Sequence, residues 1–234
     1  MNIQSQPTVL LTRPAAKSLD FAARIRAGRA DVTVIIAPLI QIEYCDLPAD
    51  ALGYDALVFT STNGVLAYQN ANAPAHKIAF CVGDQTATAA RDAGLQAISA
   101  HGDVDQLFDL ICKDAPSQPL LHIRGEHSTG DLAQRLNQRG FQTYDVIAYR
   151  QIEILLSQDA NAVLQRPGQV IAPLFSPRTA DIFAPYAKDA KASLDCVAIS
   201  ENVKQAATDF WTKSSRVASR PDAQSMLDAI FEII

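Results

Sequence analysis

The stretch LLHIRGEHSTGDLAQRLNQRGFQTYDVIAYRQ, residues 120–151, repeats the pattern of VLLTRPAAKSLDFAARIRAGRADVTVIIA, residues 9–37. Each stretch begins with an aliphatic run that leads to an arginine, Arg13 or Arg124. A helical pattern follows, and a glycine, Gly28 or Gly140, marks its end before a second β-branched run begins. Strand, helix and strand in this order are typical of a βαβ unit with parallel strands.

A second pair of stretches is also similar. LVFTSTNGVLAY from Leu57 matches PLFSPRTADIFA from Pro173, and CVGDQTATAA from Cys81 matches AISENVKQAA from Ala198. The chain therefore reads as units A, B, A′ and B′, which indicates an internal duplication. Either A packs with B and A′ with B′ in tandem, or A packs with B′ around an inserted domain made of B and A′.

The residue pattern leaves both arrangements open, but one feature favours insertion. The segments 37–43 and 147–153 both read as extended and both end in QIE, so they could run side by side between two domains. The same alternation of short apolar runs and helical patterns continues through the chain and predicts an α/β fold with parallel sheets. The predicted strands are 9–12, 32–37, 56–60, 78–82, 120–123, 143–150, 170–175, 195–199 and 215–218, and the helices between them include 84–93, 104–112 and 129–139.

Composition excludes several classes of protein. The 234 residues are 48% hydrophobic and 19% charged, which is ordinary for a globular protein, and the net charge of −5 argues against a nucleic-acid partner. The four cysteines form no CxxC pair and are expected to be reduced core residues. The sequence shows no signal-peptide pattern and no apolar run long enough to cross a membrane, so we expect a cytoplasmic protein without a membrane partner.

Polar residues follow each predicted strand, at the point where the next helix begins. Ligands of parallel α/β sheets bind at this edge, where helix N-termini offer free N–H groups to anions. Helix capping alone would select the same residue types. The residues expected to bind substrate at these strand ends are Arg13, Ser61, Thr62, Asn63, Gly64, Gly83, Thr86, Arg124, Gly125, Ser176, Pro177 and Ser200.

Other sharp motifs are missing. Gly125 to Gly130 has the spacing of a phosphate-binding loop, but Asp131 and Leu132 stand where Lys and Ser or Thr are required. GxGxxG and GxSxG do not occur, which argues against a dinucleotide enzyme and an α/β-hydrolase. The four histidines lack metal-ligand spacing, and His122 reads as a structural strand residue. We therefore expect no metal site.

The ordered series LLTRP, VFTSTNGV, CVGDQTATAARDAG, LHIRG, YDVIAYRQ, LFSPRTADIF and AISENVKQAA resembles the motif series of uroporphyrinogen-III synthases. The resemblance extends from about Val9 to Ile230. It implies two α/β domains, one inserted in the other and joined by a two-stranded ladder. The boundaries expected on this basis are 1–37 with 154–234 for the discontinuous domain, 44–147 for the inserted domain, and 38–43 with 148–153 for the ladder.

The resemblance also implies an activity. The family cyclises hydroxymethylbilane, a linear tetrapyrrole, to uroporphyrinogen III in porphyrin and heme biosynthesis, with inversion of the last pyrrole ring, loss of water and no cofactor. Tyr149 matches the tyrosine at the end of the family's v-x-x-Y strand and would act as a general acid. By the same match Ser61, Asn63, Thr86, Arg124 and Ser176 would bind substrate carboxylates, with Arg13 at the equivalent strand end of the first repeat.

Two points qualify this prediction. Asp222 follows Pro221 where many family members have threonine, and we expect it to cap the final helix away from the substrate. The alternative function is a non-catalytic two-domain protein that binds an anion or a tetrapyrrole. The expected partner is a small-molecule linear tetrapyrrole, held in a cleft between the domains of a monomer.

Overall fold

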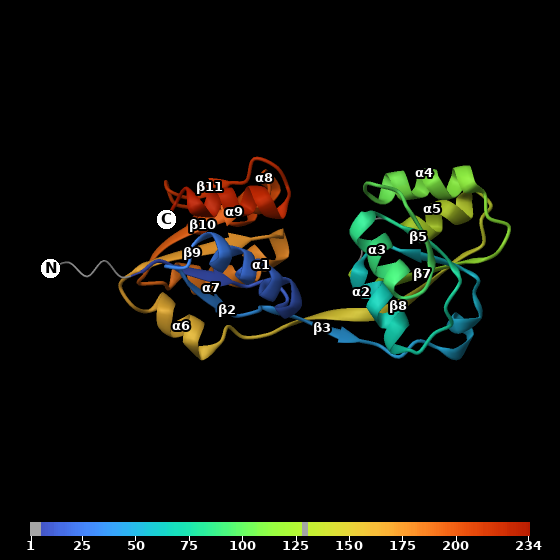
Figure 1. The fold of residues 1–234 in the computed structure, drawn as a ribbon, viewed down its shortest axis with the longest axis horizontal. Helices are drawn as coiled ribbons and strands as arrows, with labels where there is room; N and C mark the ends of the chain where they lie inside the picture. Colours follow the sequence, from blue (N-terminus) through green and yellow to red (C-terminus); the bar gives the residue numbers. More distant parts are fainter. Residues whose placement is uncertain (1–5, 128–130) are drawn as a thin grey trace. The chain divides into compact units, whose positions relative to one another are not determined.

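The computed structural model describes residues 6–127 and 131–234, and the chain divides into two compact units. Unit 1 is made of the N-terminal part up to Gln41 together with Ile152–Ile234, and unit 2 is Ile42–Gln151. Each unit has its own sheet, shown in Figure 1. The prediction of an α/β fold built on mostly parallel sheets is confirmed.

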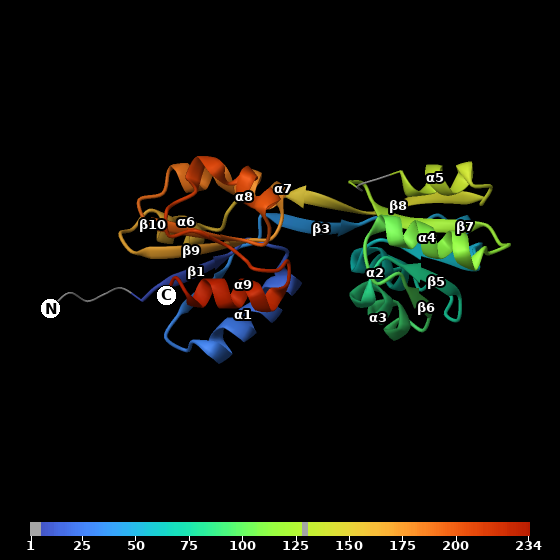
Figure 2. The same ribbon diagram turned by 90° about the horizontal axis from the view of Figure 1, so that it is seen from above.

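Unit 1 holds a five-stranded parallel sheet in the order β11-β10-β9-β1-β2. The strands are β1 (Thr8–Leu11), β2 (Thr33–Ile36), β9 (Gln169–Leu174), β10 (Ser193–Ala198) and β11 (Arg216–Val217). Helices pack on both faces of this sheet, and its central strands are therefore nearly all apolar. One face is covered by α1 (Ala15–Gly28) and α9 (Ala223–Phe231), the other by α6 (Gln158–Leu164), α7 (Pro177–Lys188), α8 (Glu201–Ala206) and η2 (Thr208–Phe210) (Figures 1 and 2).

Unit 2 holds a six-stranded sheet in the order β3-β8-β7-β4-β5-β6. The strands are β3 (Ile40–Tyr44), β4 (Ala56–Phe59), β5 (Ile78–Cys81), β6 (Gln96–Ser99), β7 (Leu120–Gly125) and β8 (Thr143–Glu153). Its helices are η1 (Ala49–Gly53), α2 (Thr62–Asn70), α3 (Asp84–Asp92), α4 (Val104–Asp114) and α5 (Leu132–Gln138). Two apolar clusters fill the opposite faces of the sheet, one beneath α2 and α3 and the other beneath α4 and α5.

The two sheets repeat one another in the order of their strands. β7 and β8 take in unit 2 the places of β1 and β2 in unit 1, and β4, β5 and β6 take those of β9, β10 and β11. The similar stretches of sequence therefore form equivalent parts of two equivalent sheets. Because β1 pairs with β9 rather than with β4, the first sheet combines strands from both ends of the chain.

The chain leaves unit 1 along β3 and returns along β8, and these strands are neighbours (Figure 2). Ile154 donates its N–H to the Leu39 carbonyl at 3.0 Å, and Cys45 donates to the Ala148 carbonyl at 2.9 Å. The residue number falls along β8 as it rises along β3, so the two strands run antiparallel. β8 is longer than the strand 143–150 predicted from sequence, because these pairs continue its extended backbone to Glu153.

Glycines end two of the helices, as the sequence pattern predicts. Gly94 after α3 and Gly140 after α5 have φ values of +81° and +90°, in the left-handed region that residues with a side chain avoid. The helix predicted from Thr129 begins at Leu132 in the described chain, and residues 128–130 lie outside the described residues. β6 and α6 were not predicted, because both are short and only half apolar. None of the described helices is long and apolar enough to cross a membrane.

Candidate functional site

The carboxyl edge of the sheet in unit 2 carries the first group of predicted site residues. Ser61 is the N-cap of α2, and its Oγ accepts a hydrogen bond from the Asn63 N–H at 3.2 Å. A Cβ on Gly64 would lie 2.6 Å from the Ile123 carbonyl oxygen, so only glycine lets this helix begin so close to β7. Ser61, Thr62 and Asn63 are all partly exposed and accessible to a ligand.

The next strand end along this edge begins α3. Gly83 occupies the N-cap position and makes no side-chain cap, so the first N–H groups of α3 remain available to an anion. Thr86, predicted to bind a carboxylate, is only 5% exposed and packs in the first turn of the helix. The backbone of this turn is therefore more accessible to a ligand than the Thr86 side chain.

Tyr149 is placed by a bulge in β8. Arg124 is paired with Ile147 but Gly125 with Tyr149, so Ala148 is an extra residue on the β8 side. The extra residue breaks the alternation of faces, and Ala148 and Tyr149 are both buried as a result. A Cβ on Gly125 would lie 2.7 Å from the Tyr149 ring and 2.9 Å from its hydroxyl oxygen. The phenol therefore occupies the space that a side chain at position 125 would fill.

Arg124 is held by its own surroundings. Its Nη1 donates to the Gly125 carbonyl at 3.1 Å, and its Nε lies 3.4 Å from Oδ1 of Asp145. Burial alone would raise the pKa of the Asp145 carboxyl, but its interactions with His122 and Arg124 outweigh burial and lower that pKa. Arg124 is thus already partnered by a carboxylate, which leaves it less able to bind a second one.

Arg13, the equivalent residue in unit 1, has a different environment. Its guanidinium lies 3.9 Å from the centre of the Phe175 ring, and in the described part of the chain its buried Nε has no hydrogen-bond partner. Thr12 is 1% exposed, and its Oγ1 likewise has no partner there. Burial lowers the pKa of Arg13, and the same effect together with the Arg13 charge lowers the pKa of the nearby surface residue Lys17. A carboxylate bound here would supply a negative charge beside the Arg13 guanidinium and an acceptor for donors that lack one among the described residues.

The remaining predicted residues of unit 1 begin α7 and α8. Ser176 caps α7 by accepting from the Thr179 N–H at 3.2 Å, with Pro177 in the first helical turn. Ser200 caps α8 by accepting from the Val203 N–H at 3.5 Å. Both serines are partly exposed and lie at the carboxyl ends of neighbouring strands, β9 and β10.

Substituting Ser176 with alanine is expected to lower the free energy of unfolding of the protein by about 1 kcal/mol, because α7 loses its side-chain cap. Urea denaturation measures this change. Ser176→Thr keeps a hydroxyl that can cap the helix and should recover most of the loss. If Ser176→Ala were as stable as the unsubstituted protein, the hydroxyl would contribute nothing as a cap.

Asp222 caps α9, as the sequence predicts. Its Oδ1 accepts from the Ser225 N–H at 2.8 Å, and its other carboxylate oxygen lies 3.2 Å from Nε of Arg220. The hydrogen bond from Ser225 is the main reason that its pKa is lowered. The ionised carboxylate of Asp222 therefore has its partners within its own turn of the chain.

Sequence reasoning missed one polar cluster. His122 is 2% exposed, its Nδ1 lies 2.8 Å from Oδ1 of Asp145, and its Nε2 lies 3.2 Å from Oγ1 of Thr60. A histidine inside an otherwise apolar strand was the available signal, but its partners are 62 and 23 residues away in sequence. Within residues 6–127 and 131–234, no three His, Cys, Asp or Glu side chains come together as metal ligands.

The sequence profile of the family described as Uroporphyrinogen-III synthase HemD matches residues 20–228, which is most of the chain. The chain belongs to the uroporphyrinogen-III synthase HemD family. Matches to curated protein sequences are not found at a significant level.

Solved structures support the HemD fold. A uroporphyrinogen-III synthetase from Helicobacter pylori is similar with a TM-score of 0.70 and 16% identity, over 98% of this chain and 100% of the other. A mutant uroporphyrinogen III synthase from Thermus thermophilus is similar with a TM-score of 0.55 and 15% identity, over 97% and 98% of the two chains. At such identities the likeness concerns the fold alone. HemD membership itself places this chain among proteins of tetrapyrrole biosynthesis.

Proposed function

We propose that this chain cyclises hydroxymethylbilane to uroporphyrinogen III, with inversion of the last pyrrole ring and loss of water. The observation that carries the proposal is the match of the HemD family over residues 20–228. The polar strand ends of both units support it, because each offers the N–H groups and hydroxyls that bind carboxylates.

The reaction needs little from the protein beyond positioning. The hydroxyl group of hydroxymethylbilane leaves readily as water once its oxygen accepts a proton, because the pyrrole nitrogen of the same ring supplies the electrons for cleavage of the C–O bond and leaves a protonated azafulvene. The protein must hold the flexible tetrapyrrole in the conformation from which the correct ring closes. The N-termini of α2 and α3 in unit 2 are candidate positions for carboxylates of the substrate, and unit 1 offers the equivalent positions at α7 and α8, with Arg13 as a further partner for a carboxylate.

Tyr149 is the proposed general acid for loss of the hydroxyl group. A phenol can donate its proton to the departing oxygen, and the buried ring over Gly125 holds its O–H in one place. Tyr44 is a second phenol close to Tyr149, and burial is the main reason that the pKa of Tyr44 is raised.

The test is to supply hydroxymethylbilane, oxidise the products and resolve the I and III isomers by chromatography. Formation of the III isomer well above the no-enzyme control is the expected result. If only the I isomer appears, at the rate of the control, the proposal is wrong. Binding of the tetrapyrrole without turnover would then indicate the non-catalytic binding protein instead.

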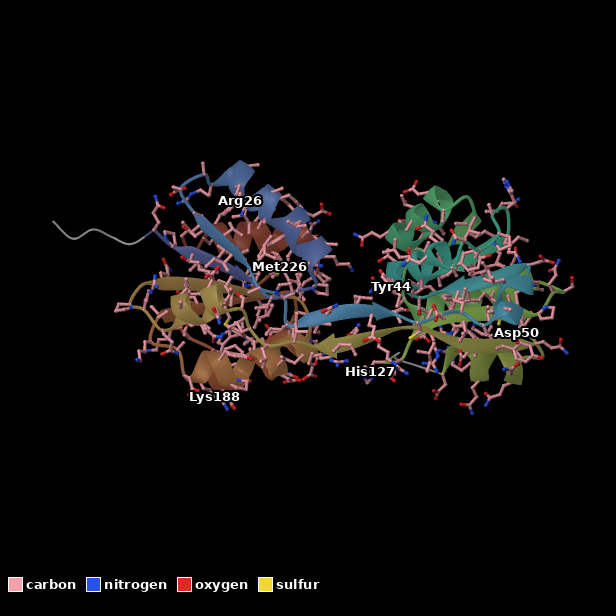
Figure 3. All side chains as sticks on the ribbon, turned by 90° about the horizontal axis from the view of Figure 1, so that it is seen from below. Arg26, Tyr44, Asp50, His127, Lys188 and Met226 are labelled. Carbon is pink, nitrogen blue, oxygen red and sulfur yellow. The ribbon has the colours of Figure 1, made fainter. Side chains whose placement is uncertain are left out.

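Replacing Arg13 with methionine is expected to raise KM for hydroxymethylbilane roughly tenfold or more, because a charge-assisted hydrogen bond to a carboxylate is worth about 1.5–3 kcal/mol. Steady-state kinetics measures the change. Arg26→Met is the matched control, since Arg26 is an exposed residue at the other end of α1, about 20 Å away by the rise of the helix (Figure 3). Equal KM values for the two variants would rule out a direct role for Arg13.

A further inference from the structure

Thr60, His122 and Asp145 form a continuous hydrogen-bonded chain across three neighbouring strands of unit 2. Thr60 directly follows β4, His122 lies within β7, and Asp145 lies opposite His122 on β8. Asp145 and Thr60 contact the two nitrogens of the imidazole, at 2.8 and 3.2 Å. The histidine is buried, but Thr60 is partly exposed beside Ser61, at the edge where the helix N-termini lie.

The direction of these hydrogen bonds follows from the chemistry of the groups. An ionised carboxylate only accepts, so Asp145 fixes the proton of a neutral imidazole on Nδ1. Nε2 then carries the lone pair and accepts the hydrogen of the Thr60 hydroxyl. The Thr60 oxygen is left as an acceptor toward solvent, and the hydrogen bonds behind it increase its electron density.

The fold does not require this chain of polar groups. The repeat in unit 1 has Leu11 at the position of His122, and Leu11 pairs with Ile36 where His122 pairs with Asp145. Leu11 is fully buried, so the equivalent sheet closes well with an apolar pair. Burying the imidazole of His122 costs more than burying an aliphatic side chain, which indicates a role other than packing.

We propose that Asp145 and His122 are positioning residues that hold the Thr60 hydroxyl as a hydrogen-bond acceptor for a pyrrole N–H group of the substrate. The inference rests on the proposed function, since it concerns the same substrate. Helix N-termini, serine caps and arginine supply donors for carboxylates, and a tetrapyrrole also carries N–H donors that need acceptors. Thr60 supplies an acceptor at this edge, and the hydrogen bond to the buried His122 behind it prevents the hydroxyl from turning its hydrogen toward the ligand.

The experiment compares Thr60→Val, which keeps the shape of the side chain without the hydroxyl, with Thr60→Ser, which restores the hydroxyl. Thr60→Val should raise KM for hydroxymethylbilane roughly tenfold, as expected when a buried donor loses its acceptor, while kcat changes less than about threefold. Thr60→Ser should return KM to within about threefold of the unsubstituted protein. His122→Phe should raise KM similarly, and the double variant His122→Phe/Thr60→Val should be no worse than Thr60→Val alone.

Two further measurements keep this inference separable from the proposed function. The ¹⁵N NMR spectrum of the free protein should show His122 protonated on Nδ1 and not on Nε2, and the opposite tautomer would overturn the inference. Affinity for uroporphyrinogen III, which also carries pyrrole N–H groups, should fall roughly tenfold in Thr60→Val even if the protein formed no III isomer. Unchanged KM and unchanged affinity in Thr60→Val would overturn the role of Thr60 while leaving the proposed activity intact.

Discussion

Replacing Tyr149 with phenylalanine is expected to lower kcat for formation of uroporphyrinogen III at least about a hundredfold, because a positioned general acid contributes roughly 10²–10⁴ to the rate. The substitution removes one oxygen and leaves the ring in its place over Gly125, so the packing of β7 against β8 should survive. KM should change little, since the phenol acts on the departing hydroxyl. Initial rates of isomer III formation, corrected for spontaneous closure to isomer I, measure the effect.

Tyr144→Phe is the matched control for this substitution. Tyr144 lies on the same strand, β8, but it is 52% exposed and stacks edge to face with Tyr54. It should keep kcat within about twofold, because it lies at the amino end of the strand, away from the helix N-termini. A Tyr149→Phe variant with the full rate would show that the proton comes from elsewhere.

Gly125→Ala is expected to lower kcat by about tenfold to a hundredfold without touching the phenol chemically. The added methyl group would lie 2.7 Å from the Tyr149 ring, so the ring must move. A displacement of about 1 Å in a catalytic group can reduce the rate about a hundredfold. The cost in stability should stay within about 1–3 kcal/mol, because the atoms that must give way belong to a side chain and not to the backbone.

Gly53→Ala separates this steric effect from the general effect of replacing a glycine in unit 2. A Cβ at Gly53 would meet no atom within 4 Å, so this variant should keep both the rate and the stability. The informative measurement is kcat together with the near-ultraviolet circular dichroism of the tyrosines. An active Gly125→Ala protein with an unchanged tyrosine signal would contradict the close packing of Tyr149 on Gly125.

The local pattern of the sequence predicted most of the helices and strands. Strands such as β4 and β5 are buried on both faces and therefore appear as short aliphatic runs. Helices such as α3 end at a glycine that adopts a left-handed conformation, which needs no information from distant residues. The α/β class and the two matched pairs of repeats followed from these local signals.

The sequence pattern also predicted the polar residues at the strand ends, but it did not predict how their environments differ. Ser61 and Ser176 were expected at helix N-termini because capping depends on the next three residues. Arg13 and Arg124 are equivalent in sequence, yet Arg124 is partnered by Asp145 while the Nε of Arg13 has no partner among the described residues. The environment of Arg124 depends on Asp145, which lies on a different strand and outside the LHIRG motif that contains Arg124.

The sequence by itself determined that this protein is a duplicated α/β chain with donor groups at its strand ends, because helix periodicity, caps and turns act over a few residues. Only the tertiary structure decided that β1 pairs with β9 and β7 with β4, since pairing between distant strands depends on which apolar faces bury one another. The tertiary structure also decided the bulge that buries Tyr149 over Gly125. It likewise decided the hydrogen bonds that link Asp145, His122 and Thr60. Each requires side chains from separate strands to meet, and local propensity carries no information about such meetings.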